Sequence, residues 1–197
     1  MYQGKTCVAI IPARGGSKGI PRKNIKEIAG KPLIWYSINS ALKSAYIDKV
    51  VVTTDDEEIR RVAIECGAQA PFLRPAELAI DRARSLPVVQ HAVKWMQDNE
   101  GKSFNYVMLL HPTSPFKTSE DLDECIRIAV EKDADSVISM YALSNFSIAK
   151  LKRITDEGFI VPFLPEYPEG NDPIPRHELP TMYKRNAAIF LTKKSTA

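Results

Sequence analysis

The chain has 197 residues, of which 44% are hydrophobic and 26% are charged, and its formal net charge is +3. This composition is ordinary for a globular protein with one well-buried core. The mild charge, concentrated in one loop and not along a face, does not support a general nucleic-acid binder. The longest apolar runs, such as residues 107–110, are too short for a transmembrane helix, and the N-terminus shows no signal peptide. Three widely spaced cysteines predict buried thiols rather than disulfides or a metal site, so we expect a cytoplasmic protein without membrane contact.

Strand and helix signals alternate along the chain, which is typical of parallel βα units. The runs that predict strands are 6–11, 49–54, 70–73, 106–110, 136–140 and 187–192. The central runs are continuously apolar and β-branched, as expected where both faces of a sheet are covered. Helices are expected to start near Pro32, after Asp55 or Asp56, at Ser85 and after a cap at Ser119. The sequence therefore predicts an α/β fold with a mostly parallel central sheet flanked by helices.

The composition changes after Met140. Residues 162–180 contain six of the fourteen prolines, which excludes a helix interior or a central strand. Residues 150–155 and 159–161 are expected to form a hairpin. We interpret 141–180 as an excursion from a single domain that spans residues 1–197, and an excursion of this length is typically functional or an oligomer contact.

A loop rich in glycine and basic residues follows the first expected strand, at residues 10–25. Six basic residues and one acidic residue lie between Arg14 and Lys31. Glycines let backbone N–H groups approach an anion closely, and the end of a strand is where open α/β sheets bind ligands. The loop matches neither GxxxxGK[ST] nor GxGxxG, which disfavours kinases and dehydrogenases. We predict a phosphate-binding loop of another kind; a glycine turn followed by a solvated basic surface is the alternative.

Four segments, in this order and spacing, resemble the cytidylyltransferases that activate nonulosonic acids: N-acylneuraminate (sialic acid) cytidylyltransferase and its legionaminate and pseudaminate relatives. The segments are ARGGSKGIPRKN (13–24), RPAELAID (74–81), LLHPTSPFKT (109–118) and PRHELPTMYKRNAAIF (175–190). The resemblance implies a Rossmann-like fold of the nucleotide-diphospho-sugar transferase type with a protruding dimerisation element, residues 141–180, that also contacts the sugar. It further implies a homodimer that transfers CMP from CTP to a sugar acid with Mg²⁺ and releases pyrophosphate.

The same resemblance assigns roles in the nucleotide site. The catalytic residues that it implies are Arg14, Lys18, Lys23 and Asn24. The residues that it implies for nucleotide binding are Ala13, Arg14, Gly15, Gly16, Lys18, Arg74 and Ser85. Cations would hold the triphosphate, and Arg74 and Ser85 would recognise the base. Arg74 precedes a proline and so lies outside any helix, although a plain surface arginine is the alternative.

A second group of residues would contact the sugar acid. The residues that the resemblance assigns to it are His111, Thr113, Ser114, Lys150, Arg176, Lys184 and Asn186. Cations suit the carboxylate of a sugar acid, and Lys150 would reach a neighbouring subunit's site. The family usually has Gln where His111 stands, which leaves the identity of the sugar open. For each cation a solvated surface charge is the alternative.

No metal ligand is named from the sequence. Relatives continue into an IDIDxxxD-type segment whose aspartates bind Mg²⁺, and this chain ends at Ala197 without that segment. Asp55 and Asp56 follow a strand, but they would serve equally well as helix caps. A truncated chain, or a catalytically impaired nucleotide-binding homologue, is therefore an alternative to an active enzyme. A nucleotidyltransferase for another sugar, or one that uses GTP, is also open.

Overall fold

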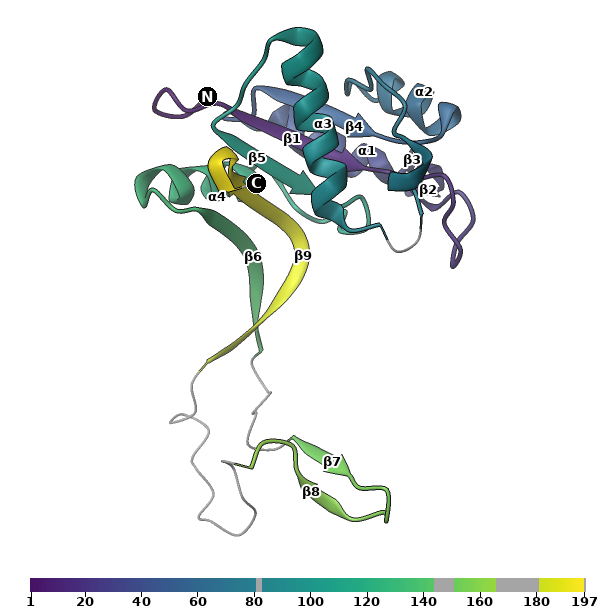
Figure 1. Cartoon of the computed structure of the whole chain (residues 1–197), viewed down its shortest axis with the longest axis vertical. Coiled ribbons are helices and arrows are strands. Elements are labelled where there is room, and N and C mark those ends of the chain that lie inside the picture. The colour runs from purple at the N-terminus through teal and green to yellow at the C-terminus, as the bar shows by residue number, and fades with distance from the viewer. Residues whose placement is uncertain (81–82, 144–150, 166–180, 197) are drawn as a thin grey trace. The chain divides into compact units, whose positions relative to one another are not determined.

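The computed structural model describes residues 1–80, 83–143, 151–165 and 181–196 (Figure 1). The chain divides into two compact units. The first consists of Met1–Ser139 and Asn186–Ala197, and the second of Met140–Arg185, which includes the proline-rich segment. None of the helices within the described ranges has the length and apolar character needed to cross a bilayer.

The main sheet has five strands in the order β4-β1-β5-β9-β6. Strands β4 (Lys49–Thr53), β1 (Cys7–Pro12) and β5 (Tyr106–Leu110) are parallel to one another. Strand β9 (Met182–Lys193) runs antiparallel to β5, and β6 (Ser136–Leu143) lies at the edge. The mostly parallel α/β sheet expected from the sequence is confirmed.

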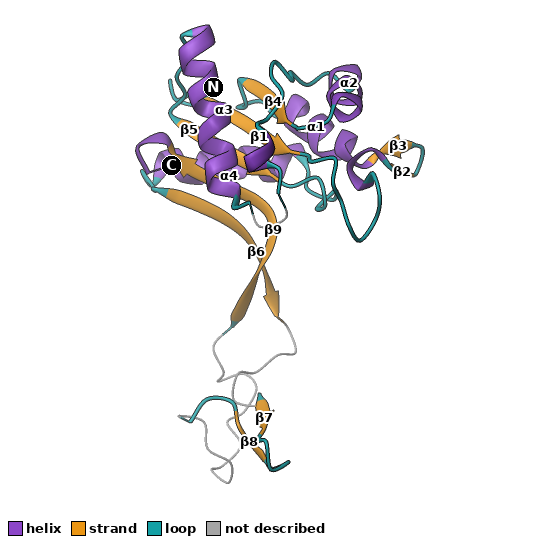
Figure 2. Cartoon of the chain, turned by 45° about the vertical axis from the view of Figure 1, so that its right-hand side comes forward, coloured by secondary structure: helices purple, strands orange, loops and turns teal. Residues whose placement is uncertain are grey.

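Helices cover both faces of this sheet, as Figure 2 shows. Side chains alternate along β1: Cys7, Ala9 and Ile11 face one core and Val8 and Ile10 face the other. The first core is closed by α1 (Leu33–Lys43), α2 (Glu57–Glu65) and α4 (Ser119–Glu131), and the second by α3 (Ser85–Glu100). Burial on both faces explains why β1 and β4 consist of continuous apolar runs.

Two local expectations are corrected. Residues 70–73 form no strand. Leu73 makes an isolated bridge with Thr54, and Gln69, just before the segment, makes one with Val51; between them Pro71 has no N–H for a ladder. Thr118, rather than Ser119, caps α4. Its hydroxyl accepts from the Asp121 N–H at 3.3 Å and its own N–H donates to the Asp121 carboxylate at 2.9 Å, so a reciprocal capping box fixes the helix start.

Short elements complete the described chain. In the first unit, β2 (Glu27–Ile28) pairs with β3 (Lys31–Pro32). The single-turn 3₁₀ helices are η1 (Lys23–Ile25), η2 (Ala76–Leu78) and η5 (Lys194–Thr196). In the second unit, β7 (Lys152–Ile154) pairs antiparallel with β8 (Ile160–Pro162), which confirms the predicted hairpin. Gly158 adopts φ +86° in its turn, a conformation that favours glycine.

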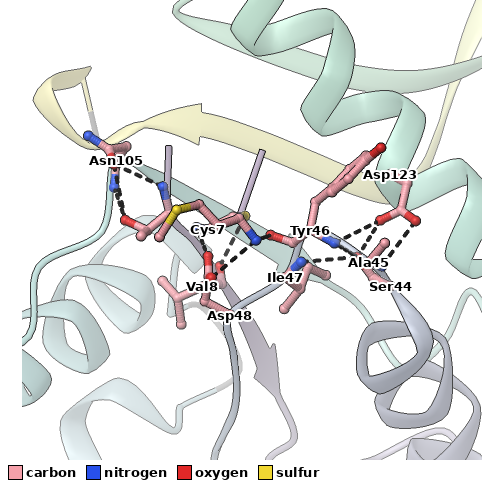
Figure 3. Close-up of polar contacts among 11 residues, drawn as sticks. Cys7, Val8, Ser44, Ala45, Tyr46, Ile47, Asp48, Asn105 and Asp123 are labelled. Carbon is pink, nitrogen blue, oxygen red and sulfur yellow. Dashed lines mark hydrogen bonds and ion pairs between the residues drawn. The ribbon is translucent and has the colours of Figure 1, made fainter. Parts of the chain in front are cut away.

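Polar contacts fasten the amino ends of β1 and β5 (Figure 3). Asp48 accepts from the Cys7 N–H at 2.8 Å, and Asn105 accepts from the Thr6 N–H at 2.9 Å. Asp123 accepts from the Ala45 and Tyr46 N–H groups at 3.1 and 3.3 Å. These side chains satisfy backbone donors at this end of the sheet, and the opposite, carboxyl end is where loops with basic residues gather.

Candidate functional site

A cavity of about 260 Å³ lies at the carboxyl ends of β1 and β5. Its walls come from the loop after β1, the segment that follows residue 73, the start of α3 and the turn after β5. The predicted site residues that line it are Arg14, Lys23, Asn24, Arg74, Ser85, His111 and Thr113. The parallel strands β1 and β5 end at the same edge of the sheet, and the segment after residue 73 and the start of α3 complete the cavity there.

The loop after β1 is held against the turn that follows β4. The Ala13 N–H donates to the Thr53 carbonyl at 3.0 Å, and the Gly15 N–H donates to Asp55 Oδ1 at 3.1 Å. Buried Asn24 lines the cavity and donates from Nδ2 to the Arg14 carbonyl at 3.0 Å. The backbone amides of Ala13 and Gly15, expected to contact the nucleotide, are thus hydrogen-bonded within the protein. These hydrogen bonds hold the first residues of the loop, 13–15, against the end of β4.

Gly15 is required by a close approach. A Cβ at this position would lie 2.7 Å from Asp56 Oδ2, whereas a Cβ at Gly16 would have no heavy atom within 4 Å. We expect Gly15→Ala to lower the free energy of unfolding by about 1–3 kcal/mol, because Asp56 must move away from its partners. Gly16→Ala should leave it unchanged within about 0.5 kcal/mol. Urea titration of both variants measures this, and equal effects would rule out the steric explanation.

Arg74 is a buried cation at the cavity wall. It is 6% exposed, its N–H donates to the Thr54 carbonyl at 2.7 Å, and its Nη2 donates to Asp55 Oδ1 at 3.4 Å. Burial lowers the pKa of Arg74, which nonetheless stays charged at neutral pH. Its Nε is buried without a hydrogen-bond partner among the described residues. The alternative of a surface arginine is therefore wrong, and the guanidinium retains donor capacity at the cavity.

The turn after β5 carries His111, whose ring packs edge-on against Phe190 with centroids 5.9 Å apart. Burial, followed by the charge of Lys117, lowers the pKa of His111, so the imidazole is neutral at pH 7. A neutral imidazole offers the cavity one donor and one acceptor. The turn itself is closed by the Ser114 N–H, which donates to the His111 carbonyl at 3.2 Å.

Lys117 holds this turn, and the sequence reading missed it. The side chain is buried, and Nζ donates to Ser37 Oγ, the His111 carbonyl and the Ser114 carbonyl at 2.8, 2.9 and 2.7 Å. Burial lowers the pKa of Lys117 to about 8, so the ammonium form prevails at neutral pH and its three hydrogens match three acceptors. Its signal was its place within the LLHPTSPFKT motif; nothing in the local pattern marks a lysine there as buried.

Other predicted residues lie away from the cavity lining. Lys18 and Gly16 are exposed on the loop after β1. Ser114 Oγ donates to the Ala187 carbonyl at 3.4 Å. Asn186 uses its Oδ1 to accept from Ser139 Oγ at 2.6 Å and from the Ala188 N–H at 3.1 Å, which is a structural role within the sheet.

Three cations were expected to contact the sugar acid: Lys150, Arg176 and Lys184. Lys184 is exposed on β9 and belongs to the second unit. Lys150 and Arg176 lie outside the described residues. The carboxylate contacts expected of these three residues therefore remain predictions.

Asp55 and Asp56 are the two acidic residues between β4 and α2. Within the described ranges, no group of three His, Cys, Asp or Glu side chains is placed to hold a metal ion. Asp55 accepts from Gly15 and Arg74. Asp56 accepts from the Ile59 N–H as the cap of α2 and pairs with Arg22, which lowers the pKa of that carboxyl. Both carboxylates are committed to structural contacts.

The fold is that of known nucleotidyltransferases. CMP:2-keto-3-deoxy-manno-octonic acid synthetase, solved in complex with CTP, superposes with a TM-score of 0.67 over 97% of this chain and 75% of that one. At 19% sequence identity the likeness shows the fold alone. The sequence profile of the cytidylyltransferase family matches residues 8–158, so the chain belongs to that family.

The relatives with similar sequences include cytidylyltransferases of sugar acids. The pseudaminic acid cytidylyltransferase of Campylobacter jejuni subsp. jejuni serotype O:2 is 48% identical over 117 residues, which are 59% of this chain and 50% of the relative. The N-acylneuraminate cytidylyltransferase of Escherichia coli O18:K1:H7 is 35% identical over 187 residues, 95% of this chain and 42% of the relative. The chain spans about half the length of the curated relatives that it matches.

Proposed function

We propose that the chain binds CTP in the cavity at the strand ends and transfers CMP to a nonulosonic acid, with release of pyrophosphate. The observation that carries this proposal is the convergence of Arg14, Lys23 and Asn24 with the buried Arg74 around one cavity. Two cations on one wall suit a triphosphate, and a buried guanidinium on another suits a base carbonyl. The family of the chain and the names of its relatives support the same reaction.

In this reaction the anomeric hydroxyl of the sugar acid attacks the α-phosphorus of CTP. The new C–O–P bond forms as the bond to the β-phosphate oxygen breaks, and the hydroxyl proton passes to water. Catalysis then consists of in-line positioning and of neutralising charge on the triphosphate. Arg14 and Lys23 would hold the phosphates, Asn24 would keep the loop in place through the Arg14 carbonyl, and Lys18 would contribute from the exposed part of the loop.

The proposal includes Mg²⁺, which in this chemistry neutralises phosphate charge, as the resemblance implies. Because the described carboxylates near the cavity are committed to other partners, no ligand and no step is assigned to the ion. His111 and Thr113 line the same cavity and would face the sugar acid, and Lys150, Arg176 and Lys184 would supply charge to its carboxylate.

The test is pyrophosphate release by the chain with CTP, Mg²⁺ and a panel of acceptors. The panel contains pseudaminic, legionaminic and N-acetylneuraminic acids, together with a hexose 1-phosphate as the control for another sugar class. We expect release with at least one nonulosonic acid and none with the phosphate, and the ratio of kcat/KM values ranks the acids. CTP binding without pyrophosphate from any acid would favour the impaired homologue instead.

We propose further that the chain forms a homodimer through its second unit. On the hairpin of that unit, Ile154, Phe159 and Ile160 are 73%, 69% and 66% exposed. Apolar side chains gathered on one small hairpin mark a surface that a partner covers. Light scattering at working concentration tests this, and a monomer would refute it.

A cytoplasmic location is the last part of the proposal. Cys7 and Cys125 are buried free thiols, and burial raises the pKa of the Cys125 thiol to about 12. Inert, reduced thiols are typical of a reducing compartment. Fractionation of the native host tests it, and recovery outside the cytoplasm would contradict it.

A further inference from the structure

One carboxylate oxygen connects two walls of the cavity. Asp55 Oδ1 accepts from the Gly15 N–H at 3.1 Å and from Arg74 Nη2 at 3.4 Å. Gly15 belongs to the loop that carries Arg14, and Arg74 forms another wall of the same cavity. Asp55 itself does not line the cavity. A single side chain behind the site therefore contacts both the loop expected to bind phosphate and the arginine expected to bind the base.

The backbone around Asp55 fixes the two walls but not the direction of the guanidinium. The Ala13 N–H donates to the Thr53 carbonyl at 3.0 Å, and the Arg74 N–H donates to the Thr54 carbonyl at 2.7 Å. These bonds hold main chain to main chain. The side chain of Arg74 is 4% exposed, and Asp55 is its ion-pair partner at 3.4 Å. The orientation of the Arg74 guanidinium thus depends on its ion pair with the Asp55 carboxylate.

The neighbouring carboxylate has a different role. Asp56 caps α2 by accepting from the Ile59 N–H at 3.0 Å, and it pairs with Arg22. These contacts involve the first turn of α2 and Arg22, and neither of them involves Arg74. The two adjacent aspartates therefore have different roles. Asp56 caps α2 and pairs with Arg22, whereas Asp55 contacts both walls of the cavity.

We infer that Asp55 is a positioning residue that couples the binding of the base to the binding of the triphosphate. The inference rests on the proposed function. Without the carboxylate, the buried Arg74 has no counter-ion and the Gly15 N–H has no acceptor among the described residues, so both walls lose their fixed geometry. If Asp55 has this role, its removal weakens the binding of both the base and the triphosphate. A residue that contacts one wall alone would weaken the binding of one of them.

Calorimetry on the full chain with three probes tests the coupling: CTP, cytidine 5′-monophosphate and inorganic tripolyphosphate. We expect Asp55→Ala to weaken the binding of CTP by about 30-fold and that of each partial probe by about fivefold. Arg74→Ala should weaken only the cytidine probes. In the double variant, the loss for CTP should fall short of the product of the two single losses, since the two residues act together.

Two further variants serve as a conservative substitution of Asp55 and as a matched control. Asp55→Asn preserves the shape of the side chain and is used where Asp55→Ala does not fold; it should still weaken both partial probes by about threefold. Glu57→Gln makes the same change at an exposed carboxylate two residues along and should bind all probes as the wild type does. Loss for one partial probe alone, or for neither, in a folded Asp55 variant would overturn the coupling. A wild type that fails to bind CTP would overturn the proposed function as well, which separates the two failures.

Discussion

Replacing Lys23 by alanine is expected to lower kcat/KM for CTP by about 100-fold, equivalent to about 3 kcal/mol of transition-state stabilisation. Lys23 lies on η1, is half-buried and lines the cavity beside Asn24. Negative charge shifts toward the pyrophosphate as it leaves, and a fixed cation stabilises this charge more in a cavity than in water. Initial rates of pyrophosphate release over a range of CTP concentrations measure the effect.

The matched control is Lys26→Ala. Lys26 follows η1 directly, is exposed and does not line the cavity. Removal of this charge should change kcat/KM by less than about twofold, since a solvated cation outside the cavity contributes little to a bound triphosphate. Both variants should retain the free energy of unfolding of the wild type within about 0.5 kcal/mol. Equal losses in the two variants would mean that the loop acts through its net charge and not through a site.

The second large effect is on stability. Lys117→Met is expected to lower the free energy of unfolding by about 3 kcal/mol at pH 7, because three acceptors lose the hydrogen bond that the buried ammonium group donates. These acceptors are Ser37 Oγ and the carbonyls of His111 and Ser114, and Ser37 is fully buried. Urea unfolding measures the loss. Lys94→Met, at an exposed lysine of α3 paired with Asp98, should have an effect below about 0.5 kcal/mol.

The difference in the free energy of unfolding between the wild type and Lys117→Met should also depend on pH, and it should increase as the pH rises. The pKa of Lys117 is about 8 in the folded protein and 10.5 for an unperturbed lysine. Between these values the unfolded state binds more protons, so the contribution of Lys117 to stability rises with pH by up to about 1.4 kcal/mol per unit. Below pH 8 Lys117 is protonated in both the folded and the unfolded state, so the difference in the free energy of unfolding does not change with pH. A difference that shrinks between pH 8 and 10.5 would contradict the burial of this charge.

Much of the architecture could be predicted from local patterns. The buried runs of β1, β4 and β5 are continuously apolar, and Asp56 begins α2 as one of the two expected caps. The grouping of Arg14 and His111 followed from a topological rule, since the parallel strands β1 and β5 end at one edge of the sheet. The family resemblance then named half of the residues that line the cavity.

The remaining features depend on tertiary contacts that local patterns do not encode. Asp55 and Arg74 are 19 residues apart in sequence, and only the packing of their segments brings one oxygen to both Arg74 and Gly15. Lys117 is expected at the surface because lysine is rarely buried, yet its side chain is buried and donates to Ser37 and to the turn after β5. Thr118 and Ser119 are equally suitable as caps by residue type. Only the hydrogen bonds that Thr118 exchanges with Asp121 show which of them begins the helix.

The central claim is that the cavity at the ends of β1 and β5 binds CTP. A crystal structure of the chain grown with CTP tests it most directly. We predict the triphosphate against Arg14 and Lys23, with the cytosine ring within hydrogen-bonding distance of the Arg74 guanidinium. A nucleotide bound elsewhere, or a cavity that holds only water at saturating CTP, would contradict the claim.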